Sequence, residues 1–147
     1  MAEMGYELAG RVLVVAHTKS APGETWNAFV RELSAHAATH WRSAPCILVF
    51  SDGGGPDAVQ RKALLDAVPQ IRNARGAVLS SNALIRGITT AFSWFTKGFR
   101  VFAPSELRAA IAWLELDKAE ETATAAIIVR LRRELGEERA RSIPRAM

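Results

Sequence analysis

The apolar positions divide the chain into short strand-like runs and longer helix-like stretches. Nearly continuous apolar runs indicate strands buried on both faces, whereas strict alternation indicates an edge strand. The predicted buried strands are Arg11–Ala16, Pro45–Phe50, Gly76–Leu79 and Phe99–Phe102. An alternating run, Gly5–Leu8, ends at Ala9 and Gly10, which predicts a tight hairpin with the next strand.

Four amphipathic stretches predict helices between and after these strands. The first begins near residue 24, and the second is capped by Asp57 with Gln60 three residues later, the spacing of a capping box. Ser81 or Asn82 caps the third helix and Ser105 the fourth. Helix by helix, the positions predicted to face the core are Trp26, Phe29, Val30, Leu33 and Ala37; Val59, Ala63, Leu64 and Val68; Leu84, Ile85, Ile88, Phe92 and Phe95; and Leu107, Ala110, Ile111 and Leu114.

The alternation of strands and helices predicts an α/β fold with a mostly parallel sheet of four to five strands. We expect residues 1–116 to form this α/β domain. Residues 117–141 read as one long amphipathic helix appended to it, and residues 142–147 as a flexible tail. That helix either folds back over the sheet or presents its narrow apolar stripe to a second copy of the chain.

Composition indicates a globular protein of one main domain. The chain has 147 residues, of which 49% are apolar and 23% charged. Its net charge of +4 comes from 19 basic and 15 acidic residues that are interspersed along the chain, so we expect no nucleic-acid partner. We also expect a cytoplasmic protein without a transmembrane segment, because no apolar run approaches about 18 residues and the N-terminus lacks a signal-peptide pattern. The single cysteine, Cys46, excludes an internal disulfide framework.

Polar side chains follow the predicted parallel strands at their carboxyl ends, where such sheets bind ligands. They include His17, Ser51, Asp52 and Ser80. A hydrolase triad can be drawn from His17, Asp52 and either serine, but the chain has no G-x-S-x-G pattern. Small polar residues also end strands for local reasons. We therefore expect no enzyme activity, no catalytic residue and no cofactor.

Two further patterns have both a functional and a purely structural interpretation. Gly53, Gly54 and Gly55 precede a helix, so they either cradle a small anion or form a flexible connection; the spacing fits neither common nucleotide-binding loop. His36 and His40 lie four apart on one helix, but no third ligand beyond Glu32 is apparent, and surface histidines explain the pattern as well. We predict no metal site.

Three tryptophans are candidates for an interaction surface. Trp94 falls off the apolar stripe of the third predicted helix, and Trp41 and Trp113 can similarly face outward. Exposed tryptophan marks partner surfaces, because a large indole is costly to leave in water. The alternative is that these rings lie beneath the appended helix. We expect a homo-oligomer or a regulatory protein partner that uses this surface.

The stretch Phe99–Leu114 gives the most specific resemblance to a known family. It resembles the last strand and helix of bacterial STAS/SEC14-type proteins, which belong to the SpoIIAA-like superfamily. The resemblance covers Gly5–Leu116 and implies a SpoIIAA-like fold. It also implies a non-enzymatic regulatory or scaffold module that acts through protein–protein association, with a second copy of the chain as the favoured partner.

The same resemblance carries two alternatives. SEC14-type relatives bind apolar ligands, which implies a possible lipid or small apolar ligand. Anti-sigma-factor-antagonist relatives carry a phosphorylatable serine where the central strand turns into a helix. Here Ser51 precedes the glycines, and the helix begins with Ala58 and Val59, without a serine. The chain departs from the phospho-switch pattern at that point.

Overall fold

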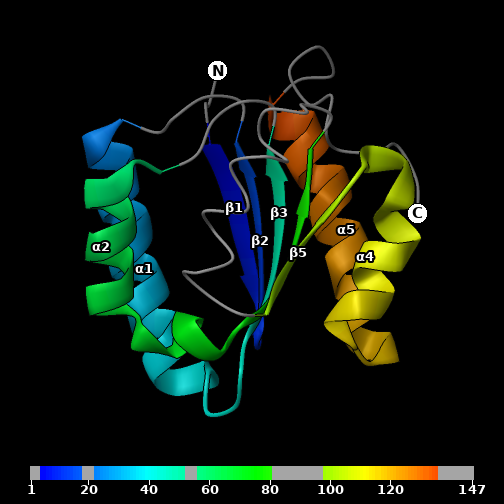
Figure 1. Cartoon of the computed structure of the whole chain (residues 1–147), viewed down its shortest axis with the longest axis horizontal. Helices are drawn as coiled ribbons and strands as arrows, with labels where there is room; N and C mark the ends of the chain where they lie inside the picture. Colours follow the sequence, from blue (N-terminus) through cyan, green and yellow to red (C-terminus); the bar gives the residue numbers. More distant parts are fainter. Residues whose placement is uncertain (1–3, 18–21, 52–55, 81–97, 136–147) are drawn as a thin grey trace.

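The described part of the chain forms a sheet covered by helices on both faces (Figure 1). This computed structural model describes residues 4–17, 22–51, 56–80 and 98–135. The strands are β1 Met4–Ala9, β2 Val12–His17, β3 Cys46–Ser51, β4 Arg75–Leu79 and β5 Phe99–Phe102. The helices are α1 Gly23–His40, α2 Ala58–Ala67, α4 Leu107–Leu114 and α5 Lys118–Leu135, with 3-10 turns at Pro69–Asn73 and Pro104–Glu106.

The five described strands lie side by side in their sequence order, β1 to β5. β1 is antiparallel to β2, and all other neighbours are parallel, which confirms the predicted mostly parallel sheet. The β1–β2 hairpin turns at Gly10, whose φ of +58° lies in the left-handed region that glycine adopts without a steric penalty. All five strands predicted from the apolar runs are present.

Each buried strand contributes to two hydrophobic cores, because successive side chains point to opposite faces. On β2, Val12 and Val14 belong to the core under α4 and α5, whereas Leu13 and Val15 belong to the core under α1 and α2. Figure 1 shows the two helix pairs on opposite sides of the sheet. This two-sided burial explains why the strands appear in the sequence as continuous apolar runs.

The first two helices confirm most of their predicted features. In α1, Trp26, Phe29, Leu33 and Ala37 are buried as expected. Asp57 and Gln60 form both hydrogen bonds of the capping box at the start of α2. The predicted apolar face of α2 is partly wrong.

Val59 is 79% exposed, and Ala63 is also exposed. Of the four positions predicted to face the core, only Leu64 within the helix and Val68 just after it are buried. α2 packs against α1, and the residues that it turns toward the core are Leu64 and Leu65 rather than Val59. The stripe predicted for a third helix, between Leu84 and Phe95, lies outside the described residues.

The long helix α5 is part of the main core. It lies along β1 and β2 on the same face of the sheet as α4. Ile127, Ile128, Leu131 and Leu135 are each at most 4% exposed and belong to one cluster with the strands. Of the two alternatives left open for this helix, the structure shows the first: α5 folds back over the sheet and contributes to its core. Residues 136–147 lie outside the described part.

None of the helices in the described ranges has the length and apolar character needed to cross a bilayer.

Candidate functional site

A row of polar side chains ends the sheet at the carboxyl ends of its parallel strands. His17 and Ser51 are register partners on β2 and β3. Ser80 follows Leu79, the register partner of Phe50, so it lies level with Ser51. All three residues are buried, with exposures of 5%, 4% and 0%. The sequence therefore located a polar edge correctly, and the structure brings its three described members into one row.

The row faces the layer formed by α1 and α2. Two residues earlier on each strand, the register aligns Val15, Val49 and Val78 on the same face. Val15 is in the core under α1 and α2, and Val49 contacts that core. Since strand side chains alternate, residues two positions further along each strand point the same way. The same face thus changes from valines to histidine and serines at its last row.

His17 is the most unusual member of this row. Burial alone lowers the pKa of its imidazole from 6.5 to about 4. Its Nδ1 atom is buried and finds no hydrogen-bond partner among the described residues. A buried polar atom without a partner costs about 1–3 kcal/mol, so such an atom calls for a functional explanation.

The remaining rim candidates lie outside the described residues. These are Asp52 and the glycines Gly53, Gly54 and Gly55. Asp52, the acid of the hydrolase triad considered from the sequence, is therefore not placed. Arg61, on α2, donates to the Pro56 carbonyl at an N–O distance of 3.1 Å, just before the helix begins.

The two α1 histidines have local partners in the structure. Their rings stack, with centroids 4.1 Å apart. His36 Nε2 lies 2.6 Å from the Gly10 carbonyl oxygen, and Glu32 accepts a hydrogen bond from the Tyr6 hydroxyl. Among the described residues, no three His, Cys, Asp or Glu side chains are grouped as metal ligands.

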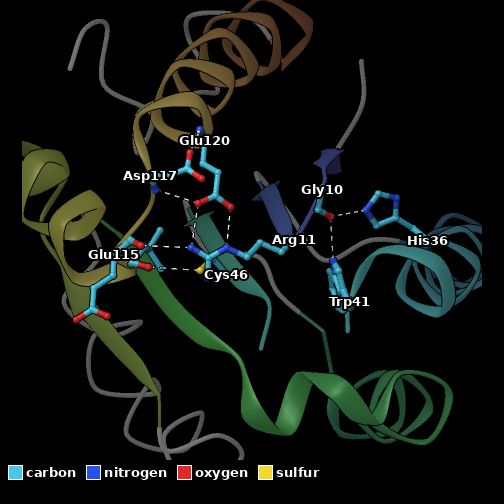
Figure 2. A network of polar contacts seen from close by, with 9 residues as sticks. Gly10, Arg11, His36, Trp41, Cys46, Glu115, Asp117 and Glu120 are labelled. Atoms are coloured by element: carbon cyan, nitrogen blue, oxygen red, sulfur yellow. Dashed lines mark hydrogen bonds and ion pairs between the residues drawn. The ribbon is translucent and has the colours of Figure 1, made fainter. Parts of the chain in front are cut away.

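The tryptophan predictions have three different outcomes. Trp41 is only 4% exposed, so the expectation that it faces outward is wrong. Its indole N–H donates to the Gly10 carbonyl over 3.2 Å, and this contact holds the ring under the β1–β2 hairpin (Figure 2). Trp94 lies outside the described residues. Trp113 is half-buried, at the surface of α4.

Two arginines flank the Trp113 ring. The guanidinium carbon of Arg75 lies 3.8 Å from the ring centroid, and that of Arg100 lies 4.5 Å from it. The indole N–H donates to the Gly76 carbonyl over 2.8 Å, which fixes the ring's orientation. Arg75 also donates to the Trp113 carbonyl and pairs with Glu115 at 3.5 Å. We call Arg75, Arg100 and Trp113 the Arg–Trp surface.

This surface lies at the opposite edge of the sheet from the polar row. Trp113 contacts Gly76 near the start of β4, whereas Ser80 follows the end of that strand. Sequence reasoning found Trp113 but missed both arginines. No local spacing relates Arg75, Arg100 and Trp113, because they come from β4, β5 and α4 and meet only in the folded chain.

A second polar cluster joins the hairpin to the helical layer (Figure 2). The guanidinium of Arg11 donates to both carboxylate oxygens of Glu120, with N–O distances of 2.7 and 2.9 Å. The same carboxylate closes a capping box with Asp117 at the start of α5. The hydrogen bond from Arg11 is the main reason that the pKa of Glu120 is lowered. This cluster stabilises the position of α5, and we assign it no binding role.

The comparisons with known proteins bear on the fold. No protein-family model matches the chain, and no curated protein matches it in sequence. One solved structure is similar in fold: that of an uncharacterized protein from the DUF3478 family, with a SpoIIAA-like fold, from Shewanella loihica PV-4. The TM-score is 0.55 at 19% identity, over 76% of this chain and 91% of that chain.

At this level of identity the likeness establishes the architecture alone. The chain has a SpoIIAA-like fold, as its resemblance over Gly5–Leu116 implied. Fold does not determine function, so what the protein binds has to be argued from its sites.

Proposed function

We propose that this chain is a non-enzymatic regulatory or scaffold module that acts by binding a protein, namely a second copy of itself. The observation that carries the proposal is the Arg–Trp surface. Tryptophan and arginine are the residue types in which interface binding energy concentrates. Here the half-buried indole donates a hydrogen bond to the Gly76 carbonyl and contacts Arg75 and Arg100, so little side-chain entropy is lost when a partner binds.

The charge of this surface favours a partner with exposed carboxylates. Arg100 is exposed on β5, the last described strand of the sheet. The chain itself offers suitable groups, because Asp117 and Glu121 at the start of α5 are exposed. Complementary charges of this kind steer association and make it sensitive to salt. A second copy can therefore supply the acidic partner.

The state of the polar row supports a binding role over a catalytic one. A general base works best when its pKa lies near the operating pH, whereas burial holds the pKa of His17 at about 4. Ser51 and Ser80 are at most 4% exposed. A hydroxyl buried to this degree is a poor target for a kinase, which also speaks against the phospho-switch alternative.

Sedimentation equilibrium over a range of protein concentrations tests self-association. We expect the unaltered chain to form a dimer and Arg100→Glu to raise its dissociation constant at least tenfold. The matched control is Arg31→Glu, which reverses the charge of an exposed residue on α1, on the other side of the sheet. Circular dichroism verifies that both variants are folded.

A monomer at every concentration, or equal weakening by both variants, would refute the proposal. Native mass spectrometry of gently purified protein separates the two alternatives. Excess mass that is lost on denaturation indicates a bound apolar ligand, and a phosphoryl increment that survives denaturation indicates the switch.

A further inference from the structure

A carboxylate lies beside the Arg–Trp surface, so the same patch carries both signs of charge. Glu115 follows the last residue of α4, and one of its carboxylate oxygens lies 3.5 Å from the guanidinium of Arg75. Its side chain is 73% exposed. Arg100, on β5, is also exposed, and its guanidinium contacts the Trp113 ring. A partner that approaches this indole therefore meets an accessible acidic group and an accessible basic group.

Glu115 does not neutralise Arg100 within one copy of the chain. In the part of the chain that the structure describes, the ion pair of Glu115 is with Arg75, and Arg100 forms none. The pair with Arg75 is long and open to solvent, so it adds little stability. An ionised carboxylate has two oxygens with about four acceptor positions, so Glu115 can bind a second guanidinium without giving up the first. Arg100 therefore offers donors, and Glu115 acceptors, to a partner.

The backbone fixes where this carboxylate lies. The φ of Glu115 is +53°, and among the described residues it is the one non-glycine in the left-handed region. Glycine is the usual residue at this point of a helix, because it has no Cβ to clash. The Arg11 guanidinium donates to the Glu115 carbonyl over 3.3 Å, and the carboxylate points away from Arg11 (Figure 2). A glycine would end α4 without the steric penalty, so the helix end alone does not explain a glutamate here.

We infer that two copies of the chain associate across a twofold axis beside Trp113, with Arg100 of each copy binding Glu115 of the other. This inference rests on the proposed self-association and names the groups that form it. In a twofold interface the same patch serves both partners, so each contact occurs twice. A patch with one exposed guanidinium and one exposed carboxylate is self-complementary in this way. A guanidinium also binds a carboxylate through two parallel hydrogen bonds, which fixes the orientation of the copies.

The two other exposed carboxylates considered above, at the start of α5, fit this role less well. Asp117 already accepts a hydrogen bond from the Glu120 backbone N–H over 2.8 Å, as the cap of that helix. Glu121 forms no ion pair with Arg75 or Arg100 among the described residues. It is an exposed glutamate six positions after Glu115, and it therefore serves as the matched control.

Charge reversal on each side of the contact gives the test. An Arg100→Glu dimer and a Glu115→Arg dimer each contain two like-charge contacts, so the dissociation constant of each should rise roughly tenfold or more. A mixture of the two variants should form a heterodimer within about threefold of the unaltered affinity, because both contacts then join opposite charges. Native mass spectrometry, with one variant labelled with ¹⁵N, measures the heterodimer. Mixing Arg100→Glu with Glu121→Arg should give no such recovery.

The outcomes separate this pairing from self-association as such. A monomeric unaltered chain would refute the proposed function and the pairing with it. A dimer that Glu115→Arg leaves intact, a mixture without recovery, or equal recovery with Glu121→Arg would overturn the pairing while the dimer stands. Glu115→Gln removes the charge without placing a second cation beside Arg75, so it tests the pairing even where Glu115→Arg does not fold. It should raise the dissociation constant about threefold, and unchanged association would overturn the pairing. Circular dichroism verifies that each variant is folded.

Discussion

Arg11, in the turn between the first two strands, binds Glu120 in the first turn of α5 through two hydrogen bonds of 2.7 and 2.9 Å. A second pair, Arg130 with Glu7, joins the same helix to β1. The helix is thus attached to the hairpin by its first turn, at Glu120, and by its second half, at Arg130. These pairs are partly exposed, so each adds modest stability, whereas the buried apolar residues of α5 contribute most to holding the helix on the sheet.

Replacing a buried residue of α5 should therefore cost much more than replacing an exposed one. Leu131 is 1% exposed and its Cδ2 lies 3.0 Å from where a Gly5 Cβ would stand. Val129, two residues earlier, is 51% exposed. We expect Leu131→Ala to lower the free energy of unfolding by about 2–5 kcal/mol and Val129→Ala by less than about 0.5 kcal/mol. Urea denaturation measures both, and equal effects would contradict the placement of the helix.

The fold should lose stability in mild acid because of His17. Its pKa is about 4 in the folded chain, against 6.5 for an ordinary histidine, so the unfolded chain binds the proton more tightly. The free energy of unfolding that depends on neutral His17 is fully present above pH 6.5 and is lost as the pH falls toward 4. In total it amounts to roughly 3 kcal/mol. Denaturation at pH 7.5 and 4.5 should show this loss, and His17→Gln should reduce it while His36→Gln retains it.

Gly98 should tolerate no side chain. A Cβ at this position would lie 2.3 Å from the carbonyl oxygen of Ala74, which is rigid backbone. Gly98→Ala should therefore destabilise the chain by more than about 2 kcal/mol. At Gly23 a Cβ meets nothing within 4 Å, so Gly23→Ala should be neutral or raise stability by up to about 1 kcal/mol. Thermal unfolding of the two variants measures this difference, and equal melting temperatures would contradict the prediction.

The thiol of Cys46 should be unreactive in the folded protein. It is 1% exposed and donates a hydrogen bond to the Leu114 carbonyl over 3.4 Å. Burial raises its pKa, and Arg11 offsets this only in part. Because the thiolate is the reactive form, a thiol reagent at pH 8 should label the chain slowly and then completely in denaturant. Rapid labelling of the native chain would show that this core opens readily.

The sequence allowed the sheet to be predicted well because its strands are buried on both faces. Every predicted strand is present, and so is the polar edge that contains His17, Ser51 and Ser80. Errors arose where a contact between distant segments decides exposure. Val59 has the spacing of a core residue but is exposed in the folded chain, where α2 packs against α1 through another face.

The tryptophans show the same dependence on contacts between distant segments. Trp41 was expected outside, yet its indole is buried and bonded to the carbonyl of Gly10, 31 residues away in sequence. Arg75 and Arg100 have no spacing that relates them to Trp113, so sequence analysis could not foresee their contacts with its ring. Burial of His17 was likewise not predictable, because it depends on the layer that α1 and α2 place over the last row of the sheet.

The attachment of α5 to the first hairpin also bears on how the chain folds during synthesis. Arg11 and Glu120 are 109 residues apart, and Glu7 and Arg130 are 123 apart. Contacts of such long range slow folding, because much of the chain must be ordered before they form. One apolar face of β1 and β2 therefore stays uncovered until α5, more than 100 residues later, has left the ribosome. β1 and β2 are thus synthesised long before the helix that closes them off from water, and the nascent chain is most prone to aggregate through them during that interval.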